Sequence, residues 1–197
     1  MKIHMAAYNP DWINEYELIR KEIASALLKW NPSIEHIGST SVPGLDAKPI
    51  IDILVGITEE IQLDEIIHPL LQLNYIYFEK YNPIMPYRRF FVKRKPDHKE
   101  VVLPSVIKEG EETPDSINDV KWAHIHVMPL QSPHWTRHIA FRNYLRAHEP
   151  VKQAYQELKH SLCLQEWENG TAYNAAKNDF IKEMEGKAVE WYHASAR

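Results

Sequence analysis

One stretch, HIGSTSVPGLDAKPIIDILVGI from His36 to Ile57, restricts the fold of this chain more than any other. Its second half, Ile50–Ile57, is almost continuously apolar, which is typical of a central strand covered on both faces. Asp52 interrupts that run, and an unpaired carboxylate inside a buried strand is energetically costly. We therefore expect Asp52 to lie either at an open end of the strand or beside a cationic partner.

The loop before this strand is rich in small and hydroxyl-bearing residues. Gly38, Ser39 and Thr40 follow the short stretch 34–37, which is expected to be a strand. Glycine lets a backbone approach a ligand closely, and hydroxyl groups with exposed N–H groups hold phosphate oxygens. The loop lacks the spacing of a P-loop, because no Gly-Lys pair follows at the required distance. It is a candidate phosphate-binding loop, with an ordinary surface loop as the alternative.

Three cationic side chains are further candidates for holding phosphate. Lys48 is followed by a proline, which keeps it extended ahead of the strand; an ordinary surface lysine is the alternative. Arg88 and Arg89 are expected on opposite faces of one strand, so one of them, with Lys93, can reach the site and bind phosphate bidentately. Arg89 is taken as the candidate, and a basic strand edge that deters aggregation is the alternative. Lys177 lies four residues after Tyr173 on one face of an expected helix, where the pair can line a cleft. A core tyrosine with a solvated lysine is the alternative there.

Asp52 and two histidines form a candidate metal site. His124 and His126 are two residues apart on an expected strand, so their side chains lie on one face. Two imidazoles so placed can ligate a metal, and Asp52 on an adjacent strand would complete a mononuclear site; a pair of structural histidines is the alternative. Asp52 can also hold Mg²⁺ against a phosphate chain. Leu54, however, occupies the position of a second carboxylate on the same face.

Composition and charge exclude several classes of protein. The 197 residues, of which 44% are hydrophobic, suffice for one domain with a real core. A net charge of -4, with acids and bases interspersed, argues against a nucleic-acid partner. The single cysteine, Cys163, excludes a disulfide within the chain, and it is expected to pack as a small hydrophobic residue.

The chain is also expected to be cytoplasmic and to have no membrane partner. No apolar run reaches the roughly 20 residues of a membrane span. The N-terminal residues lack the apolar region of a secretion signal. The sequence does not indicate an oligomeric state.

The order of the expected elements predicts a small mixed α/β core followed by a helical C-terminal segment. Residues 1–130 form the core, residues 131–197 form the helical segment packed on it, and the two together make one compact domain. Periodicity and turn residues predict helices over 11–29, 59–73, 133–148, 150–167 and 171–191, strands over 34–37, 50–57, 75–79, 87–94 and 122–128, and a long loop over 95–121.

Five stretches carry a family resemblance: HIGSTSVPGLDAKPIIDILVGI, WAHIHVMP, HIAFRNYLRAHEP, YQELK and YNAAKNDFI, in that order across almost the whole chain. Together they resemble the GrpB-like family of the nucleotidyltransferase superfamily. The resemblance implies an α/β (α+β) fold with a mixed β-sheet core flanked by helices. In that fold a Gly-Ser motif ends one strand, and acidic residues lie on the next.

The resemblance also implies a function. Members of the superfamily bind a nucleoside triphosphate through the Gly-Ser motif and use carboxylates to hold two Mg²⁺ ions. By position, Gly38 and Ser39 match that motif, and Asp52 matches the first acid, which makes Asp52 the candidate catalytic residue. Leu54 replaces the second acid, and His126 stands near the third.

The expected ligand is therefore a nucleotide or another phosphate-bearing small molecule, with Mg²⁺ or Mn²⁺ as the cofactor and metal-dependent nucleotidyl transfer as the reaction. The alternative is a catalytically lapsed fold that acts as a ligand-binding or regulatory module.

Overall fold

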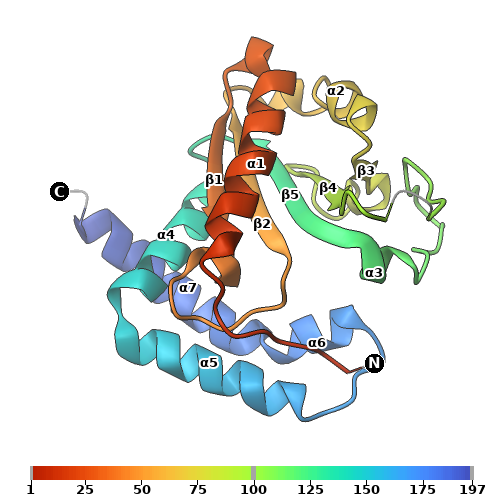
Figure 1. Cartoon of the computed structure of the whole chain (residues 1–197). Helices are drawn as coiled ribbons and strands as arrows, with labels where there is room; N and C mark the ends of the chain where they lie inside the picture. Colours follow the sequence, from red (N-terminus) through yellow and green to blue (C-terminus); the bar gives the residue numbers. More distant parts are fainter. Residues whose placement is uncertain (1, 99–100, 196–197) are drawn as a thin grey trace. The chain divides into compact units, whose positions relative to one another are not determined.

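The computed structural model of the chain describes residues 2–98 and 101–195. Within these residues the strands form one five-stranded sheet in the order β1-β2-β5-β4-β3 (Figure 1). β2 and β5 are parallel, whereas β4 is antiparallel to both β5 and β3. The expected mixed sheet is thus confirmed. The strands are β1 (Ser33–Ile37), β2 (Ile51–Ile57), β3 (Ile76–Tyr77), β4 (Arg89–Arg94) and β5 (Lys121–Pro129).

Helices precede, separate and follow the strands along the chain, and most of the helices after β5 are long. They are α1 (Asp11–Ala26), α2 (Ile67–Gln72), α3 (Ile117–Val120), α4 (Pro133–Ala147), α5 (Glu149–Cys163), α6 (Gly170–Ala176) and α7 (Asn178–Ser195). Short 3₁₀ turns cover Leu28–Trp30, Ser39–Ser41, Glu60–Leu63 and Glu79–Tyr81. None of the helices in the described part of the chain is long and apolar enough to cross a membrane.

The chain divides into two compact units, each assembled from separate segments. Unit 1 comprises residues 1–10, 37–49 and 136–197, and unit 2 comprises residues 11–36 and 50–135. The candidate phosphate loop therefore belongs to unit 1, and most of the sheet belongs to unit 2. The expected packing of residues 131–197 on residues 1–130 stays a prediction.

One face of the sheet in unit 2 is covered by α1 (Figure 1). Its residues Trp12, Tyr16, Ile19 and Ile23 are buried at helical spacing, as the periodicity predicts. An ion pair of 2.6 Å between Lys93 Nζ and a carboxylate oxygen of Glu22 joins β4 to this helix. Because side chains alternate along a strand, α1 lies on the face of β4 that carries Lys93.

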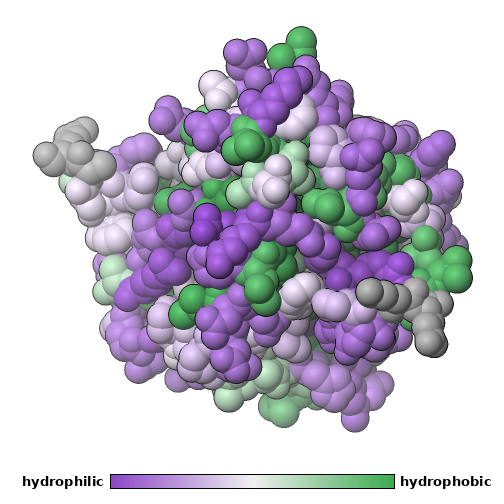
Figure 2. Space-filling view, turned by 45° about the horizontal axis from the view of Figure 1, so that its top comes forward, coloured by the Kyte–Doolittle hydropathy of each residue, from purple (hydrophilic) through white to green (hydrophobic). Residues whose placement is uncertain are grey.

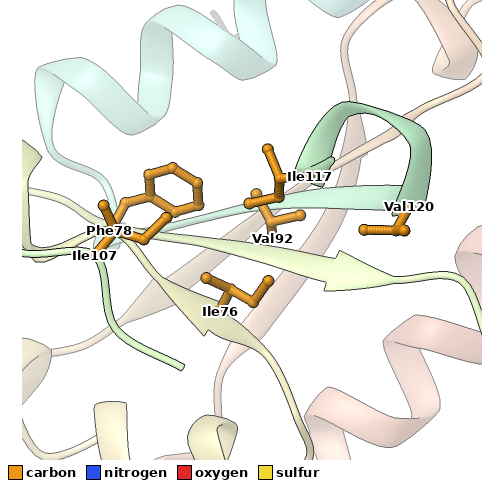
Figure 3. Packing of buried hydrophobic residues seen from close by; sticks show 6 residues of the cluster. All are labelled: Ile76, Phe78, Val92, Ile107, Ile117 and Val120. Atoms are coloured by element: carbon orange, nitrogen blue, oxygen red, sulfur yellow. The ribbon is translucent and has the colours of Figure 1, made fainter. Parts of the chain in front are cut away.

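On the opposite face of β4 a hydrophobic cluster surrounds Val92 (Figure 3). The cluster draws on the segment after β4 and shows that the loop expected over 95–121 is partly ordered. Tyr77 N donates to Ser105 O, and Ile107 N donates to Tyr77 O, both at 2.8 Å. Residues 99–100 lie outside the described residues. The cluster consists of Ile76, Phe78, Val92, Ile107, Ile117 and Val120.

Two expected helices are interrupted in the structure. The helix expected over 59–73 splits into a 3₁₀ turn and α2, because Glu59 and Gln62 cap the turn reciprocally and Pro69 falls in the first turn of α2, where no N–H is needed. The helix expected over 171–191 becomes α6 and α7. Asn169 starts α6 by accepting a hydrogen bond from Ala172 N at 3.0 Å.

Two hydrophobic clusters are found among the described residues of unit 1. In the first, Val42 and Leu45 pack with Leu145 of α4 and Tyr155 of α5. In the second, Ile3, Leu162 and Tyr173 pack together with Cys163, in keeping with its expected role as a small hydrophobic residue. On the surface of the molecule, the face seen in Figure 2 is mostly hydrophilic, with hydrophobic residues in separate spots.

Candidate functional site

The loop at Gly38 begins where β1 ends, and its conformation requires glycine. Gly38 has φ 69° and ψ -174°, a region that side chains beyond glycine essentially do not adopt. The following 3₁₀ turn is closed by Ser41, whose Oγ donates to Gly38 O at 2.7 Å. Gly38 is exposed and Ser39 half-buried, whereas Thr40 is 1% exposed. Of the three predicted residues, Gly38 and Ser39 are thus the ones open to a ligand.

Cationic side chains from the helices of unit 1 hold the carbonyl groups of this loop. Arg146 of α4 donates from Nη2 to Ser41 O at 2.6 Å, and Lys152 of α5 donates to Pro43 O at 3.2 Å. These hydrogen bonds pair the carbonyl oxygens of Ser41 and Pro43 with cationic donors, which reduces their repulsion of an anion. The half-buried Ser39 hydroxyl and the exposed Gly38 backbone are therefore the groups of this loop that can meet a ligand.

Lys159 of α5 is the functional candidate that sequence reasoning missed. Its side chain is buried, and its Nζ donates to Ser39 Oγ at 3.4 Å and to the Asp46 carbonyl oxygen. Burial, reinforced by the positive charge of Lys177, lowers the pKa of Lys159 to about 7. One sequence signal was available: Lys159 falls at the core spacing that Tyr155 and Leu162 define on the same helix.

Two more lysines gather on the ring of Tyr173. Lys48 Nζ is 4.4 Å and Lys177 Nζ is 4.5 Å from the ring centroid, which is cation–π distance. Burial raises the pKa of Tyr173 to about 12, so its hydroxyl stays neutral. Both lysines are half-buried. We call Lys48, Lys159 and Lys177 the lysine cluster.

The carboxylate nearest to the lysine cluster is directed elsewhere. Asp46 Oδ2 lies 2.9 Å from Nε2 of His160, and its Oδ1 accepts from Tyr8 N at 3.3 Å. Gln156 fixes the Asp46 backbone by accepting from its N–H at 3.0 Å. Only the carbonyl oxygen of Asp46 faces Lys159. Within the described residues, Lys159 therefore contacts Asp46 through the neutral carbonyl oxygen and not through the carboxylate.

In unit 2 the strand register brings Asp52 and the two histidines together. Asp52 lies opposite His124 on the parallel neighbour β5, and its Oδ1 is 3.1 Å from His124 Nδ1 and 3.9 Å from His126 Nε2. Phe90 of β4 covers both imidazoles, with ring centroids 5.4 Å and 5.1 Å away. Asp52 thus has two imidazoles beside it in the sheet, and the expectation of a cationic partner stays a prediction.

Hydrogen bonding fixes the protons of this group. Burial alone would raise the pKa of Asp52, but hydrogen bonds from His124 and His126 outweigh burial and hold the pKa below its ordinary value. Burial, with a contribution from the Arg88 charge, lowers the pKa of His126 to about 4. Arg88 Nη1 is 3.2 Å from His126 Nδ1. Because a guanidinium only donates, Nδ1 accepts and the proton of neutral His126 sits on Nε2.

The comparisons with known proteins identify the family. The family model described as GrpB protein matches residues 2–187. The chain belongs to the GrpB family. It is 31% identical over 188 residues to a UPF0157 protein of Pseudomonas aeruginosa, covering 95% of this chain and 68% of that protein. It is 26% identical over 187 residues to the glutamate-rich protein GrpB of Alkalihalophilus pseudofirmus, covering 93% and 94%.

A solved structure supports the fold of the family. The crystal structure of conserved protein GrpB from Enterococcus faecalis matches with a TM-score of 0.75 and 29% sequence identity, covering 96% of this chain and 99% of that chain. The GrpB family is a member of the nucleotidyltransferase-like superfamily. The fold class expected from the sequence, a mixed sheet flanked by helices with further helices at the C-terminal end, is confirmed.

The donor groups of this GrpB chain do not fit a two-Mg²⁺ site. Mg²⁺ prefers oxygen ligands, but Leu54 is fully buried apolar where the second acid would stand. His126 Nε2 carries a proton and has no lone pair for a cation. Across residues 2–98 and 101–195, no three His, Cys, Asp or Glu side chains are placed to hold one ion. The single-ion site expected at Asp52, His124 and His126 stays a prediction.

The structure places Arg88, rather than Arg89, beside the histidines. Arg89 lies opposite Val127 in the sheet register, so its side chain is on the face away from His126. There Arg89 Nε donates to Asp64 Oδ1 at 2.6 Å and Nη1 to Pro86 O at 2.8 Å. Asp52, Arg89 and the two histidines belong to unit 2, and Gly38, Ser39, Thr40, Lys48 and Lys177 belong to unit 1.

Proposed function

We propose that this GrpB protein binds a nucleotide or another phosphate-bearing small molecule at the Gly38–Ser39 loop and the lysine cluster of unit 1. The observations that carry the proposal are the positions of Lys48 and Lys177 at the Tyr173 ring and of Lys159 at Ser39, together with the effect of the Lys177 charge on Lys159. Lysine side chains grouped in this way favour an anion with several oxygens, each of which can accept a hydrogen bond from an ammonium group.

The chemistry of the loop suits phosphate in particular. Lysine ammonium groups act as point charges for phosphate, and a serine hydroxyl supplies a directed hydrogen bond. The exposed backbone at Gly38 allows an oxygen to approach closely. Tyr173 is neutral and adds a ring against which the two outer lysines are positioned.

Binding is favoured over nucleotidyl transfer as the function. Nucleotidyl transfer assisted by two cations needs several carboxylates. In this chain Asp52 occupies the position of the first acid, and the buried Leu54 replaces the second. Asp52 is engaged by His124. We therefore place a ligand-binding or regulatory module ahead of a metal-dependent transferase that would use Mg²⁺ or Mn²⁺.

The binding test is thermal unfolding with ATP, GTP, CTP, UTP and inorganic pyrophosphate, each with and without Mg²⁺ or Mn²⁺. A ligand at 100 times its Kd adds about 2.7 kcal/mol to the free energy of unfolding, which gives a measurable rise in Tm. We expect the rise in the wild type and its loss in the double variant Lys48→Met, Lys177→Met. The matched control is Lys187→Met, because Lys187 is an exposed lysine of α7 paired with Glu183. Equal shifts in all three proteins would contradict the proposal.

A separate assay decides between binding and transfer. The protein is incubated with labelled triphosphates and Mn²⁺, and pyrophosphate release is measured for the wild type and for Asp52→Asn. We expect binding without release. Release that Asp52→Asn abolishes would establish the transferase function instead.

A further inference from the structure

Lys159 is a buried ammonium group whose direct partners are neutral. They are the Ser39 hydroxyl, the Asp46 carbonyl oxygen and the face of the Tyr155 ring, 4.8 Å from Nζ to the centroid. In the described part of the chain no carboxylate forms an ion pair with it. A buried charge without a counter-charge is costly, so a group in this position readily gives up its proton.

The other titratable groups around Lys159 do not outweigh its burial. They are Tyr155 and Cys163 on α5, Lys177 at the end of α6 and Asp46 on the loop, with His160 bonded to Asp46 and Tyr173 next to Lys177. Tyr173 is neutral, and Lys177 adds a second positive charge. Asp46 attracts the proton, but its two carboxylate oxygens are bonded to His160 and Tyr8.

We propose that a phosphate-bearing ligand binds at the Ser39 loop together with one proton, which Lys159 takes up from solvent. This inference rests on the function proposed above. The ligand brings further negative charge to the buried Lys159, and the amine of Lys159 becomes an ammonium. No covalent bond is formed or broken other than the new N–H bond.

The contact with Ser39 explains how protonation reaches the ligand. A serine hydroxyl has one proton to donate and accepts up to two. When Lys159 is charged, it donates to Ser39 Oγ, and the hydroxyl proton is left to point at the anion. When Lys159 is neutral, its lone pair accepts that proton and the hydroxyl turns away. Lys159 is therefore a positioning residue that acts through Ser39.

The pKa of about 7 for Lys159 in the free protein agrees with this scheme, because the amine is then partly deprotonated near neutral pH. We expect ligand affinity to fall by up to about tenfold per pH unit above that value, as long as one proton must be taken up. Lys48 and Lys177 are half-buried and meet the ligand from the Tyr173 side.

The test is isothermal titration calorimetry of the 197-residue chain with ATP and, in parallel, inorganic pyrophosphate, without divalent cations, from pH 6 to 8.5. Each titration is run in two buffers with different heats of ionisation, which gives the number of protons taken up. Because both probes titrate in this range themselves, the compared quantity is the uptake of the wild type minus that of Lys159→Arg. The arginine variant keeps the charge and does not release its proton at these pH values.

We expect the wild type to take up close to one proton more than Lys159→Arg at pH 8, and its affinity to fall with pH more steeply. Lys159→Met should also lose the extra uptake, and Lys187→Met should behave as the wild type. Unfolding curves of each variant confirm that it is folded. NMR titration of the Lys159 side chain, which needs no ligand, should show a midpoint near pH 7.

Failure of the inference and failure of the proposed function have different signatures. If neither probe binds at any pH, the proposed function is rejected and this inference with it. If a probe binds with the same uptake in the wild type and Lys159→Arg, or if the NMR midpoint is that of an ordinary lysine, the inference alone is overturned.

Discussion

His126 shows at the scale of one residue how neighbours set the charge of an imidazole. Arg88 bonds to its Nδ1 and Phe90 covers its ring, so the neutral form is favoured even though Asp52 lies 3.9 Å away. The nearby carboxylate raises the pKa of His126, but burial has the larger effect. The result is a histidine that differs in protonation between the folded and unfolded chain below pH 6.5.

This difference predicts a pH dependence of stability. The pKa of His126 is about 4 in the folded chain, below the ordinary value of 6.5, so between these values the unfolded chain binds a proton that the folded chain lacks. The free energy of unfolding therefore falls as pH drops from 6.5 to 4, by about 3 kcal/mol from this residue. His126→Gln should remove that part of the fall, as measured by urea unfolding at several pH values.

The control for this experiment is His68→Gln, since His68 is an exposed histidine of the same unit. Its stability should fall with pH as the wild type does. An equally steep fall in His126→Gln would show that the buried imidazole is not responsible.

At the scale of elements, β2 passes close to the start of α4. A Cβ on Gly56 would lie 2.6 Å from Trp135 Cζ3 and 2.7 Å from Leu130 Cδ1, which is closer than real contacts allow. The backbone N–H of Trp135 donates to Ser132 Oγ at 3.2 Å, at the predicted start of the helix, and this bond holds Trp135 in position. The glycine in the strand is thus required by packing, since it allows β2 and the Trp135 ring to meet.

Two Gly→Ala substitutions should therefore have opposite effects. We expect Gly56→Ala to lower the free energy of unfolding by about 1–3 kcal/mol through overpacking. Gly186→Ala in α7 should raise it by up to about 1 kcal/mol, because nothing lies within 4 Å of the added carbon and alanine favours helix. Urea unfolding measures both. If Gly56→Ala left the free energy of unfolding unchanged, the side chains of Trp135 and Leu130 would be able to move away from the added carbon without destabilising the protein.

At the scale of the whole molecule, unit 1 is assembled from three segments of the chain. Val42 and Leu45 come from the segment after the candidate loop, and they are buried against Leu145 and Tyr155 from the C-terminal helices. The loop that carries Gly38 and Ser39 thus depends for its packing on residues more than 100 positions later.

A chain cut after residue 130 should accordingly lose the order of this loop. It would expose Val42 and Leu45, which are 0% exposed in the whole chain. We expect this fragment to bind a hydrophobic dye, to show weak near-UV circular dichroism and to unfold without a sharp transition, in contrast to the full chain. A sharp transition without dye binding would show that residues 1–130 fold on their own.

Local patterns were sufficient for much of the fold. The spacing of Trp12, Tyr16 and Ile19 predicted α1, and the apolar run around Asp52 predicted β2, because both depend on periodicity that a short window contains. Strand alternation also put His124 and His126 on one face. The break between α6 and α7, and the ordering of the segment before α3, were not contained in any short window.

The order of neighbouring residues was enough to identify the family, the mixed sheet and the motif residues Gly38, Ser39 and Asp52. The contact of Arg88 with His126, and the burial of Lys159 against Ser39, 120 positions away in the chain, became evident from the folded chain alone. Burial and charge partners depend on how distant elements pack, which no short stretch of sequence contains. The burial of Lys159 in α5 depends on the loop that carries Ser39 and Asp46, so the sequence of the helix alone does not predict it.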